Sequence, residues 1–337
     1  MPATRPRRGR RVDSDMTDDT FSRLSGEPLP DEAIFIGGIG RSGKTYVRLM
    51  LAAHPSIALS KRTNLWTRYY DCFGDLADDA VLDRCLAAMW TNKHVRALEP
   101  DAEALRREFR RGPRTYAHLF ALLHRRYAAR LGKTRWGDQT EGVEEMAGPI
   151  FAALPNARII HLIRDPRDRY EALSSRRPGR LEEAVSRWLR SAELGARNER
   201  RYPDRYCVVR YETLAREPAE TLGRLCGFLG IDATDDMLAL GHAARFGDDR
   251  AGDDRTGDSP ISAAYVGRFR EHLAAHEIAY IQHRAGPLMA CFDYMPEPVA
   301  LSWSGRVRCD VTPVAAALAR AGGRLARLGS GRPEPGR

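Results

Sequence analysis

The stretch that decides the fold runs from Glu32 to Thr45 and reads EAIFIGGIGRSGKT. The apolar run Glu32–Gly37 predicts a buried parallel strand, and Gly38–Thr45 matches G-x-x-x-x-G-K-[ST] at every position. Thr45 to Ala53 then has helix-forming residues at apolar spacing. A strand, a glycine-rich turn and a helix in this order form an anion cradle from backbone N–H groups and a helix N-terminus. The stretch therefore predicts a loop that binds phosphate.

Strand and helix patterns alternate along the rest of the chain. The predicted strands are 57–59, 157–163 and 206–210, and the predicted helices are 181–200, 214–229 and 272–289. Helical spacing also fills most of 76–131, most clearly at Tyr116, Leu119, Phe120, Leu123 and Tyr127. Such alternation is typical of a parallel sheet covered on both faces. We expect an α/β fold: a P-loop-containing three-layer αβα sandwich with a central parallel sheet.

The segments around this body differ in composition. We expect a disordered basic extension at 1–30, one domain at 31–298 with a helical insertion at about 62–131, and a basic tail at 299–337. Within the domain, 245–260 is rich in Gly, Asp and Arg without periodicity, which predicts a mobile loop.

The net charge of +9 is concentrated in the termini. Residues 1–12 and 301–337 each carry +5, which leaves the body between them at −1. A nucleic-acid-binding fold needs a basic face on the folded part, so we expect no nucleic-acid partner. Weak membrane-surface contact of the basic tails, of which 314–328 could form an amphipathic helix, is the less favoured alternative to frayed termini.

Cysteine spacing and hydropathy set the expected compartment. The six cysteines show no zinc-ligand spacing, and a chain of 337 residues does not need disulfide staples. The basic N-terminus is followed by acidic residues rather than an apolar segment, and no apolar run is long enough to cross a membrane. We expect a cytoplasmic protein with reduced thiols and no bound metal; the oligomeric state stays open.

Two further motifs point to anions at the ends of predicted strands. Arg164 follows the strand 157–163 within RDPRD, where its guanidinium could clamp a phosphate or pair with Asp165 or Asp168. Tyr211 follows the strand 206–210, where it could contact a base or pack as a corner aromatic. Anion-directed residues at several strand ends predict a nucleotide with phosphates at two places.

These motifs carry a resemblance to a known family. GRSGKT after a strand, IIHLIRDPRDRY, and YCVVRYETLAREPAETLGRLCGFLGI together resemble the sulfotransferases that use 3′-phosphoadenosine 5′-phosphosulfate (PAPS). The closing segment VGRFREHLAAHEIAYIQHRAGPLMACFDY is similar to that family's C-terminal helices, so the likeness covers roughly residues 32–295. It implies transfer of a sulfuryl group from PAPS to a hydroxyl of a small-molecule, sugar or glycolipid acceptor, with no metal.

The resemblance also implies roles for particular residues. Arg41, Lys44 and the loop amides would stabilise charge on the leaving oxygen, and Asp138 or Glu141 would accept the acceptor's proton. The residues expected to bind PAPS are Gly40, Arg41, Ser42, Gly43, Lys44, Thr45, Tyr46, Arg164, Ser174, Tyr211 and Arg255, with Arg250 as an alternative to Arg255. We expect the insertion at about 62–131 to form the acceptor pocket, with Trp66, Tyr69, Tyr70 and Trp90 as apolar contacts.

The chain departs from the family pattern at four positions. Lys44 stands where a Thr is usual, Ala172 where a Ser binds the 3′-phosphate, Arg62 where many members have a catalytic Glu, and Gln139 where a Lys is common. These departures keep two alternatives open. One is an ATP-dependent P-loop small-molecule kinase, which Lys44 and Thr45 would favour, and the other is a nucleotide-binding scaffold without turnover.

Overall fold

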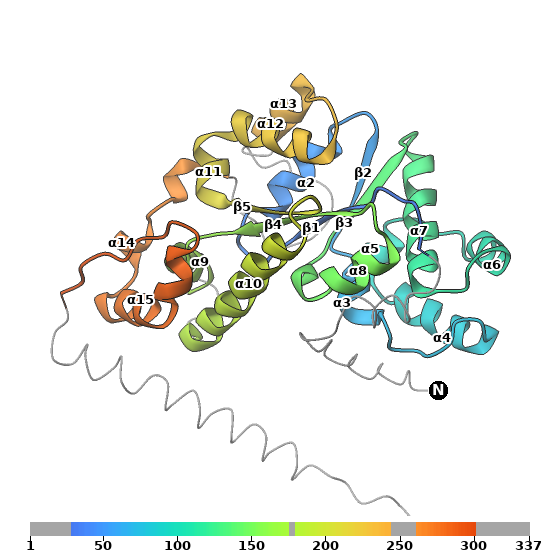
Figure 1. The fold of residues 1–337 in the computed structure, drawn as a ribbon, viewed down its shortest axis with the longest axis horizontal. Coiled ribbons are helices and arrows are strands. Elements are labelled where there is room, and N and C mark those ends of the chain that lie inside the picture. Colours follow the sequence, from blue (N-terminus) through green and yellow to red (C-terminus); the bar gives the residue numbers. More distant parts are fainter. Residues whose placement is uncertain (1–27, 175–178, 244–260, 301–337) are drawn as a thin grey trace, which may run out of the picture. The chain divides into compact units, whose positions relative to one another are not determined.

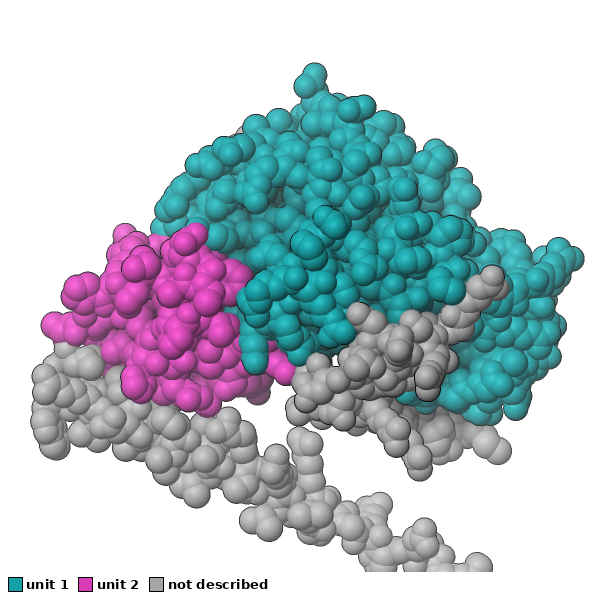
Figure 2. All heavy atoms as spheres, viewed as in Figure 1, with its two compact units in different colours: residues 1–164, 191–266 teal, residues 165–190, 267–337 magenta. Residues whose placement is uncertain are grey.

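The computed structural model describes residues 28–174, 179–243 and 261–300. The chain forms two compact units, coloured separately in Figure 2. The first unit comprises residues 1–164 and 191–266, and the second comprises residues 165–190 and 267–337. The features predicted at 1–27, 245–260 and 301–337, including the roles of Arg250 and Arg255, lie outside the described residues.

The first unit is built on a parallel sheet in the order β2-β3-β1-β4-β5. These strands are β1 (Ile34–Gly37), β2 (Ile57–Lys61), β3 (Arg135–Gln139), β4 (Arg158–Ile163) and β5 (Tyr206–Arg210). The chain leaves β1 towards β2 on one side and leaves β4 towards β5 on the other. This reversal makes the carboxyl ends of β1 and β4 a topological switch point, where α/β sheets bind ligands.

Alternating side chains of the strands fill two cores, one on each face of the sheet. Ile34 and Ile36 of β1 face one core with α2 (Lys44–Ala52), and Phe35 between them faces the other with α7 (Tyr116–Arg130). Figure 1 shows α2, α12 and α13 on one side of the strands and α3 and α8 on the other. The expected three-layer αβα fold is therefore confirmed.

The remaining helices flank the sheet or belong to the second unit. On the α7 face the chain forms α3 (Leu65–Tyr69), α4 (Asp79–Trp90), α5 (Lys93–Arg96), α6 (Ala102–Arg111), η1 (Val143–Glu145) and α8 (Ala147–Ala153). The later elements are α9 (Pro166–Ser174), α10 (Leu181–Arg201), α11 (Tyr211–Arg216), α12 (Pro218–Leu229), α13 (Asp235–Ala243), η3 (Ala263–Tyr265), α14 (Phe269–His272) and α15 (Ala275–Ala290). Among the described residues, no helix combines the length and apolarity that a membrane crossing requires.

Two elements differ from the sequence expectation. Strand β3 was not predicted because its sequence, RWGDQ, is polar and contains a glycine. Gly137 is needed there, since a Cβ would lie 2.1 Å from the Ile34 carbonyl oxygen. The expected continuous helix 214–229 is instead two helices, because Pro218 disfavours a helical conformation at Glu217 (φ −129°, ψ 59°).

The second unit has its own small core and a buried polar framework. Tyr170, Val185, Phe269 and Ile281 are among its buried apolar residues. The Asp168 carboxylate of α9 accepts from the backbone N–H groups of Gly267 (2.6 Å) and Phe269 (3.0 Å). The expected helix 272–289 corresponds to α15, which begins at Ala275, shortly after α14 ends at His272.

Candidate anion-binding and transfer site

Residues Gly38–Thr45, which the sequence predicts to bind phosphate and which we call the phosphate loop, adopt a compact, partly strained conformation. Gly43 (φ +92°) and Arg41 (φ +73°) both adopt left-handed backbone conformations, which cost a non-glycine residue about 1 kcal/mol. The Ser42 hydroxyl donates to the Ile39 carbonyl at 2.7 Å and ties the turn together. Successive N–H groups in such a turn form a concave anion site at the start of α2.

Lys44 opens α2 and is almost completely buried. Its ammonium group donates to the carbonyl oxygen of Gly38, at the other end of the loop. The side chain therefore spans the turn and keeps its positive charge beside the loop amides. A compact cation with three donors can bind both the loop and an anionic group placed in it.

Arg164 lies at the same edge of the sheet, directly after β4. Its guanidinium donates to the Arg41 carbonyl at 3.3 Å and to the Tyr265 carbonyl at 2.8 Å. It also lies 4.2 Å above the ring of Tyr211, close enough for a cation–π interaction. Arg164 and the loop are therefore in direct contact at this edge of the sheet.

Tyr211 packs against both the phosphate loop and Arg164. Its ring is buried, and a Cβ at Gly43 would lie 3.1 Å from it, so this close approach and the φ of +92° favour glycine at that position of the loop. Its hydroxyl lies 3.4 Å from the Ser262 backbone nitrogen, and burial raises the pKa of the phenol. The structure thus places Tyr211 as a packed platform that joins the loop to Arg164.

The other charged residues of RDPRD have structural partners in the second unit. Asp165 binds the Arg167 guanidinium through both carboxylate oxygens, at 3.0 and 2.6 Å. Arg167 also lies 4.2 Å over the ring of Phe269. Within this motif, Arg164 is the arginine that contacts the phosphate loop, and Arg167 supports its own unit.

Asp138 is fully buried and its carboxylate is a hub of hydrogen bonds. It accepts from the Ser60 hydroxyl at 2.6 Å, from the Thr63 backbone at 3.3 Å, and from the hydroxyls of Thr63 and Thr140. These bonds fix the connection between β2 and α3, where Arg62 has φ +48°. Both carboxylate oxygens are occupied in this way, which disfavours the expected role of Asp138 as a base.

Glu141 lies beside the loop, in contrast to Asp138. Its backbone N–H donates to the Asn64 side-chain oxygen at 3.0 Å. One carboxylate oxygen of Glu141 is 4.0 Å from the position that a Cβ on Gly40 would occupy. Of the two acids that the sequence put forward as bases, Glu141 is therefore the one next to the anion cradle.

The remaining predicted residues are placed as follows. Thr45 and Tyr46 are in the first turn of α2, with Tyr46 buried. Ser174 is in α9, where its hydroxyl donates to the Glu171 carbonyl at 2.9 Å. Gln139 ends β3, 1% exposed, and no described residue hydrogen-bonds to its Oε1 atom.

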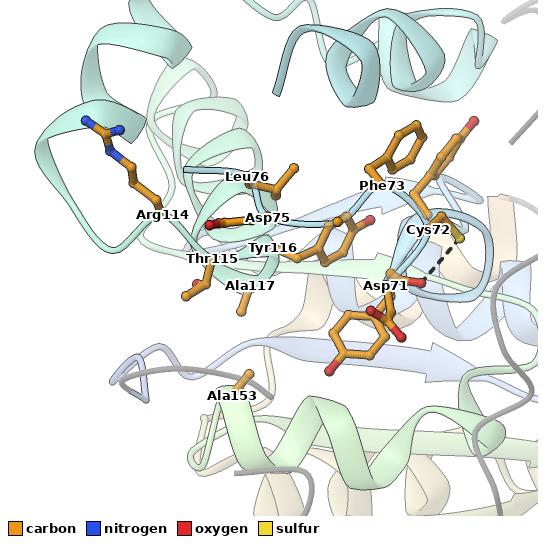
Figure 3. Close-up of a pocket in the computed structure, with 13 residues that line it drawn as sticks. Asp71, Cys72, Phe73, Asp75, Leu76, Arg114, Thr115, Tyr116, Ala117 and Ala153 are labelled. Atoms are coloured by element: carbon orange, nitrogen blue, oxygen red, sulfur yellow. Dashed lines mark hydrogen bonds between the residues drawn. The ribbon is translucent and has the colours of Figure 1, made fainter. Parts of the chain in front are cut away.

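A cavity of about 310 Å³ lies among helices of the first unit (Figure 3). The residues of its wall come from 69–76, from 114–117 and from Ala153. Tyr69 and Tyr70 line it as the sequence suggested, together with Phe73 and Tyr116, whereas Trp66 and Trp90 do not. All lining residues except Ala153 thus come from the predicted insertion at about 62–131.

Sequence reasoning missed one buried acid beneath the loop. Glu144 of η1 accepts a hydrogen bond from the Gly38 backbone N–H at 3.3 Å. The double glycine Gly37–Gly38 was the available signal, since a Cβ on Gly37 would lie 2.0 Å from a Val143 methyl. Close approach of η1 to the loop is what these glycines permit.

A parallel α/β sandwich with a glycine-rich loop after β1 has a P-loop-like fold. The particular family follows from comparison with known proteins. The model of the Sulfotransferase family matches residues 33–236, more than half of the chain, and the chain belongs to this family.

Two relatives illustrate the range of similarity. The protein-tyrosine sulfotransferase of Drosophila melanogaster is 24% identical over 240 residues, which cover 68% of this chain but only 44% of that protein. The solved sulfotransferase domain from the Synechococcus PCC 7002 olefin synthase has a TM-score of 0.56 and 22% identity. That comparison covers 80% of this chain and 98% of the domain, and it supports the fold.

Proposed function

We propose that this protein transfers the sulfuryl group of PAPS to a hydroxyl of a small-molecule, sugar or glycolipid acceptor. The observation that carries the proposal is the contact of the Arg164 guanidinium with the Arg41 carbonyl, 3.3 Å apart. A guanidinium that can bind one phosphate therefore lies beside a loop that can hold another. This arrangement supports a nucleotide with two separate anionic groups. Membership of the Sulfotransferase family supports the same chemistry.

The loop would hold the reacting end of PAPS. Backbone N–H groups of Gly40–Thr45 and the N-terminus of α2 face the anion, and Arg41 and Lys44 add positive charge. Sulfuryl transfer, like phosphoryl transfer, gains most from positioning and from donors aimed at the leaving oxygen. Lys44, which donates to the Gly38 carbonyl, is close enough to the loop to neutralise that charge.

We assign the proton acceptor to Glu141 in place of Asp138. Glu141 lies beside Gly40, whereas the carboxylate of Asp138 is engaged by Ser60, Thr63 and Thr140. A base must lie within hydrogen-bond reach of the hydroxyl that it deprotonates. Asp138 instead holds the connection between β2 and α3, in which Arg62 has φ +48°.

The helical insertion would provide the acceptor compartment. Its cavity of about 310 Å³ is at the small end of the range for ligand sites, and its wall combines aromatic rings with the charged residues Asp71, Asp75 and Arg114. A compact hydroxyl compound with a ring and polar groups fits such a wall. Arg164 would bind the 3′-phosphate, with Ser174 and Arg255 as further predicted ligands because Ala172 offers no hydroxyl. A cytoplasmic location stays a prediction.

Isothermal titration calorimetry without magnesium tests the donor assignment. We expect adenosine 3′,5′-bisphosphate to bind at least about 100-fold more tightly than ATP, because ATP has no 3′-phosphate for Arg164. ATP binding that is tighter, and that strengthens with magnesium, would instead favour the small-molecule kinase. Tight bisphosphate binding with no release of bisphosphate from PAPS would favour a scaffold without turnover.

A further inference from the structure

A chain of buried polar side chains lies beneath the start of the phosphate loop. Glu144 of η1 is 3% exposed, and its two carboxylate oxygens have different partners. One oxygen accepts from the Gly38 backbone N–H at 3.3 Å, and the other accepts from the Ser191 hydroxyl of α10. Both oxygens of the Glu144 side chain are therefore hydrogen-bond acceptors.

The chain continues from Ser191 into the sheet. The Ser191 oxygen lies 3.1 Å from Nε2 of His161 in β4, and Nδ1 of His161 lies 2.6 Å from the hydroxyl of Tyr206 in β5. Since Ser191 uses its proton on Glu144, its oxygen accepts from His161 Nε2–H, and Nδ1 then accepts from the Tyr206 hydroxyl. Each donor is used once, and the chain of donors ends at Glu144.

Burial keeps the intermediate members of this chain neutral. It lowers the pKa of His161, an effect that Glu144 partly offsets, and it raises the pKa of Tyr206 well above its usual range. All four side chains are buried. The negative charge of Glu144 is thus held in place by neutral donors.

Glycines allow this chain to approach the loop. A Cβ on Gly38 would lie 3.1 Å from the His161 ring and 2.2 Å from the Leu162 carbonyl oxygen, and a Cβ on Gly195 would lie 2.8 Å from the same ring. His161 is therefore wedged between the loop and α10. Small residues on both sides fix its position.

We propose that Glu144 is a positioning residue for the phosphate loop, oriented by the chain Tyr206–His161–Ser191. Glu144 binds the N–H of Gly38 while Lys44 binds its carbonyl, so the peptide groups on both sides of the Gly38 Cα atom are fixed. This orientation sets where the loop amides and Lys44 meet the anion. The inference rests on the proposed function in that the anion is the sulfuryl donor.

The test compares Glu144→Gln and Ser191→Ala with the wild-type protein. The amide introduced by Glu144→Gln cannot accept at both ends, so we expect the Kd for adenosine 3′,5′-bisphosphate to rise about tenfold, and about threefold for Ser191→Ala. In the slow release of bisphosphate from PAPS with water as acceptor, KM for PAPS should rise about tenfold and kcat should also fall, since the loop and Lys44 contact the donor both before and during transfer.

Glu182→Gln is the matched control. Like Glu144, Glu182 is a buried glutamate with a hydrogen bond to each oxygen. Its two donors are the hydroxyls of Ser186 and Tyr280, and it belongs to the second unit. We expect its replacement to lower the melting temperature as Glu144→Gln does while leaving Kd and KM within about twofold. A Glu144→Gln protein that loses only kcat, with Kd and KM unchanged, would overturn the inference.

Hydrogen exchange separates this inference from the donor assignment. If the wild-type protein binds no bisphosphate, the proposed function fails. The exchange rate of the Gly38 amide then still tests whether Glu144 positions the loop. Glu144→Gln should speed exchange in a peptide spanning Ile34–Thr45 about tenfold or more, with Glu182→Gln unchanged. Equal exchange in all three proteins would reject the positioning role. Should Glu144→Gln fail to fold, Ser191→Ala carries the same comparison.

Discussion

Arg164 and Arg167, three positions apart in the RDPRD motif, have different contacts and different roles. Arg164 donates to the loop carbonyl of Arg41 and stacks on Tyr211, whereas Arg167 is bound by Asp165 and stacks on Phe269. The sequence predicted Arg164 as the phosphate ligand from its place after a buried strand. The role of Arg167 depends on a contact distant in sequence, with Phe269, which no local pattern reveals.

Arg164→Ala should weaken binding of adenosine 3′,5′-bisphosphate by about 100-fold, because two charge-assisted hydrogen bonds to the 3′-phosphate are lost. Arg164→Lys should recover only part of this affinity, since a lysine lacks the planar fork. Titration calorimetry measures both. Arg167→Ala is the comparison: it should lower the melting temperature with Kd within about threefold, and an equal loss of affinity in both alanine variants would contradict the division of roles.

Glu141→Gln should lower the rate of bisphosphate release from PAPS by about 100-fold or more, because the amide cannot take a proton from the attacking hydroxyl or water. Its Kd for adenosine 3′,5′-bisphosphate should stay within about threefold. Asp138→Asn should chiefly lower the melting temperature, since an amide cannot accept at both ends, from the Ser60 hydroxyl at Oδ1 and from the Thr63 and Thr140 hydroxyls at Oδ2. If a folded Asp138→Asn protein lost more of the release rate than Glu141→Gln does, Asp138 and not Glu141 would be the proton acceptor.

At the scale of elements, the sequence predicted those with a strong local pattern. The strand, loop and helix at Glu32–Ala53 and the apolar face of α7 were predicted and confirmed. Strand β3 was missed because its polar residues are stabilised by tertiary partners: Asp138 by hydroxyls of its neighbours, and Trp136 by the carboxylate of Asp31 at 3.0 Å. Glu144 and its hydrogen-bonded chain were missed for the same reason.

Lys133 stabilises the far end of the helix that begins with the phosphate loop. Its ammonium donates to the carbonyl oxygens of Ala52 (2.6 Å), His54 (3.1 Å) and Ile57 (2.9 Å), which closes the C-terminus of α2. Lys133→Met should lower the free energy of unfolding by about 1–3 kcal/mol, measured by urea denaturation. The exposed Lys93→Met should change it by less than about 0.5 kcal/mol. Equal effects would contradict the capping role.

At the scale of the whole molecule, buried neutral histidines make stability depend on pH. Burial is the first cause that lowers the pKa values of His124 and His161 below 6.5, with neighbouring acids acting in the opposite direction. The unfolded chain therefore takes up protons near pH 6.5 that the folded chain does not take up until a lower pH. The free energy of unfolding should fall as pH decreases through this window.

Urea denaturation at pH 7.5, 6.5 and 5.5 measures this dependence. We expect stability to be nearly constant above pH 7 and to fall below pH 6.5 by up to about 2.7 kcal/mol per pH unit for the two histidines. A His124→Gln protein, which keeps a polar partner for Ser60, should show a shallower decrease. Unchanged stability between pH 7.5 and 5.5 would contradict the neutral burial of these histidines.

The central claim is that the loop and Arg164 together present PAPS for sulfuryl transfer, and release of adenosine 3′,5′-bisphosphate from PAPS tests it most directly. The wild-type protein should release the bisphosphate without magnesium, and Lys44→Ala should do so about 100- to 1,000-fold more slowly. A wild-type protein that leaves PAPS intact but releases ADP from ATP with magnesium would contradict the claim.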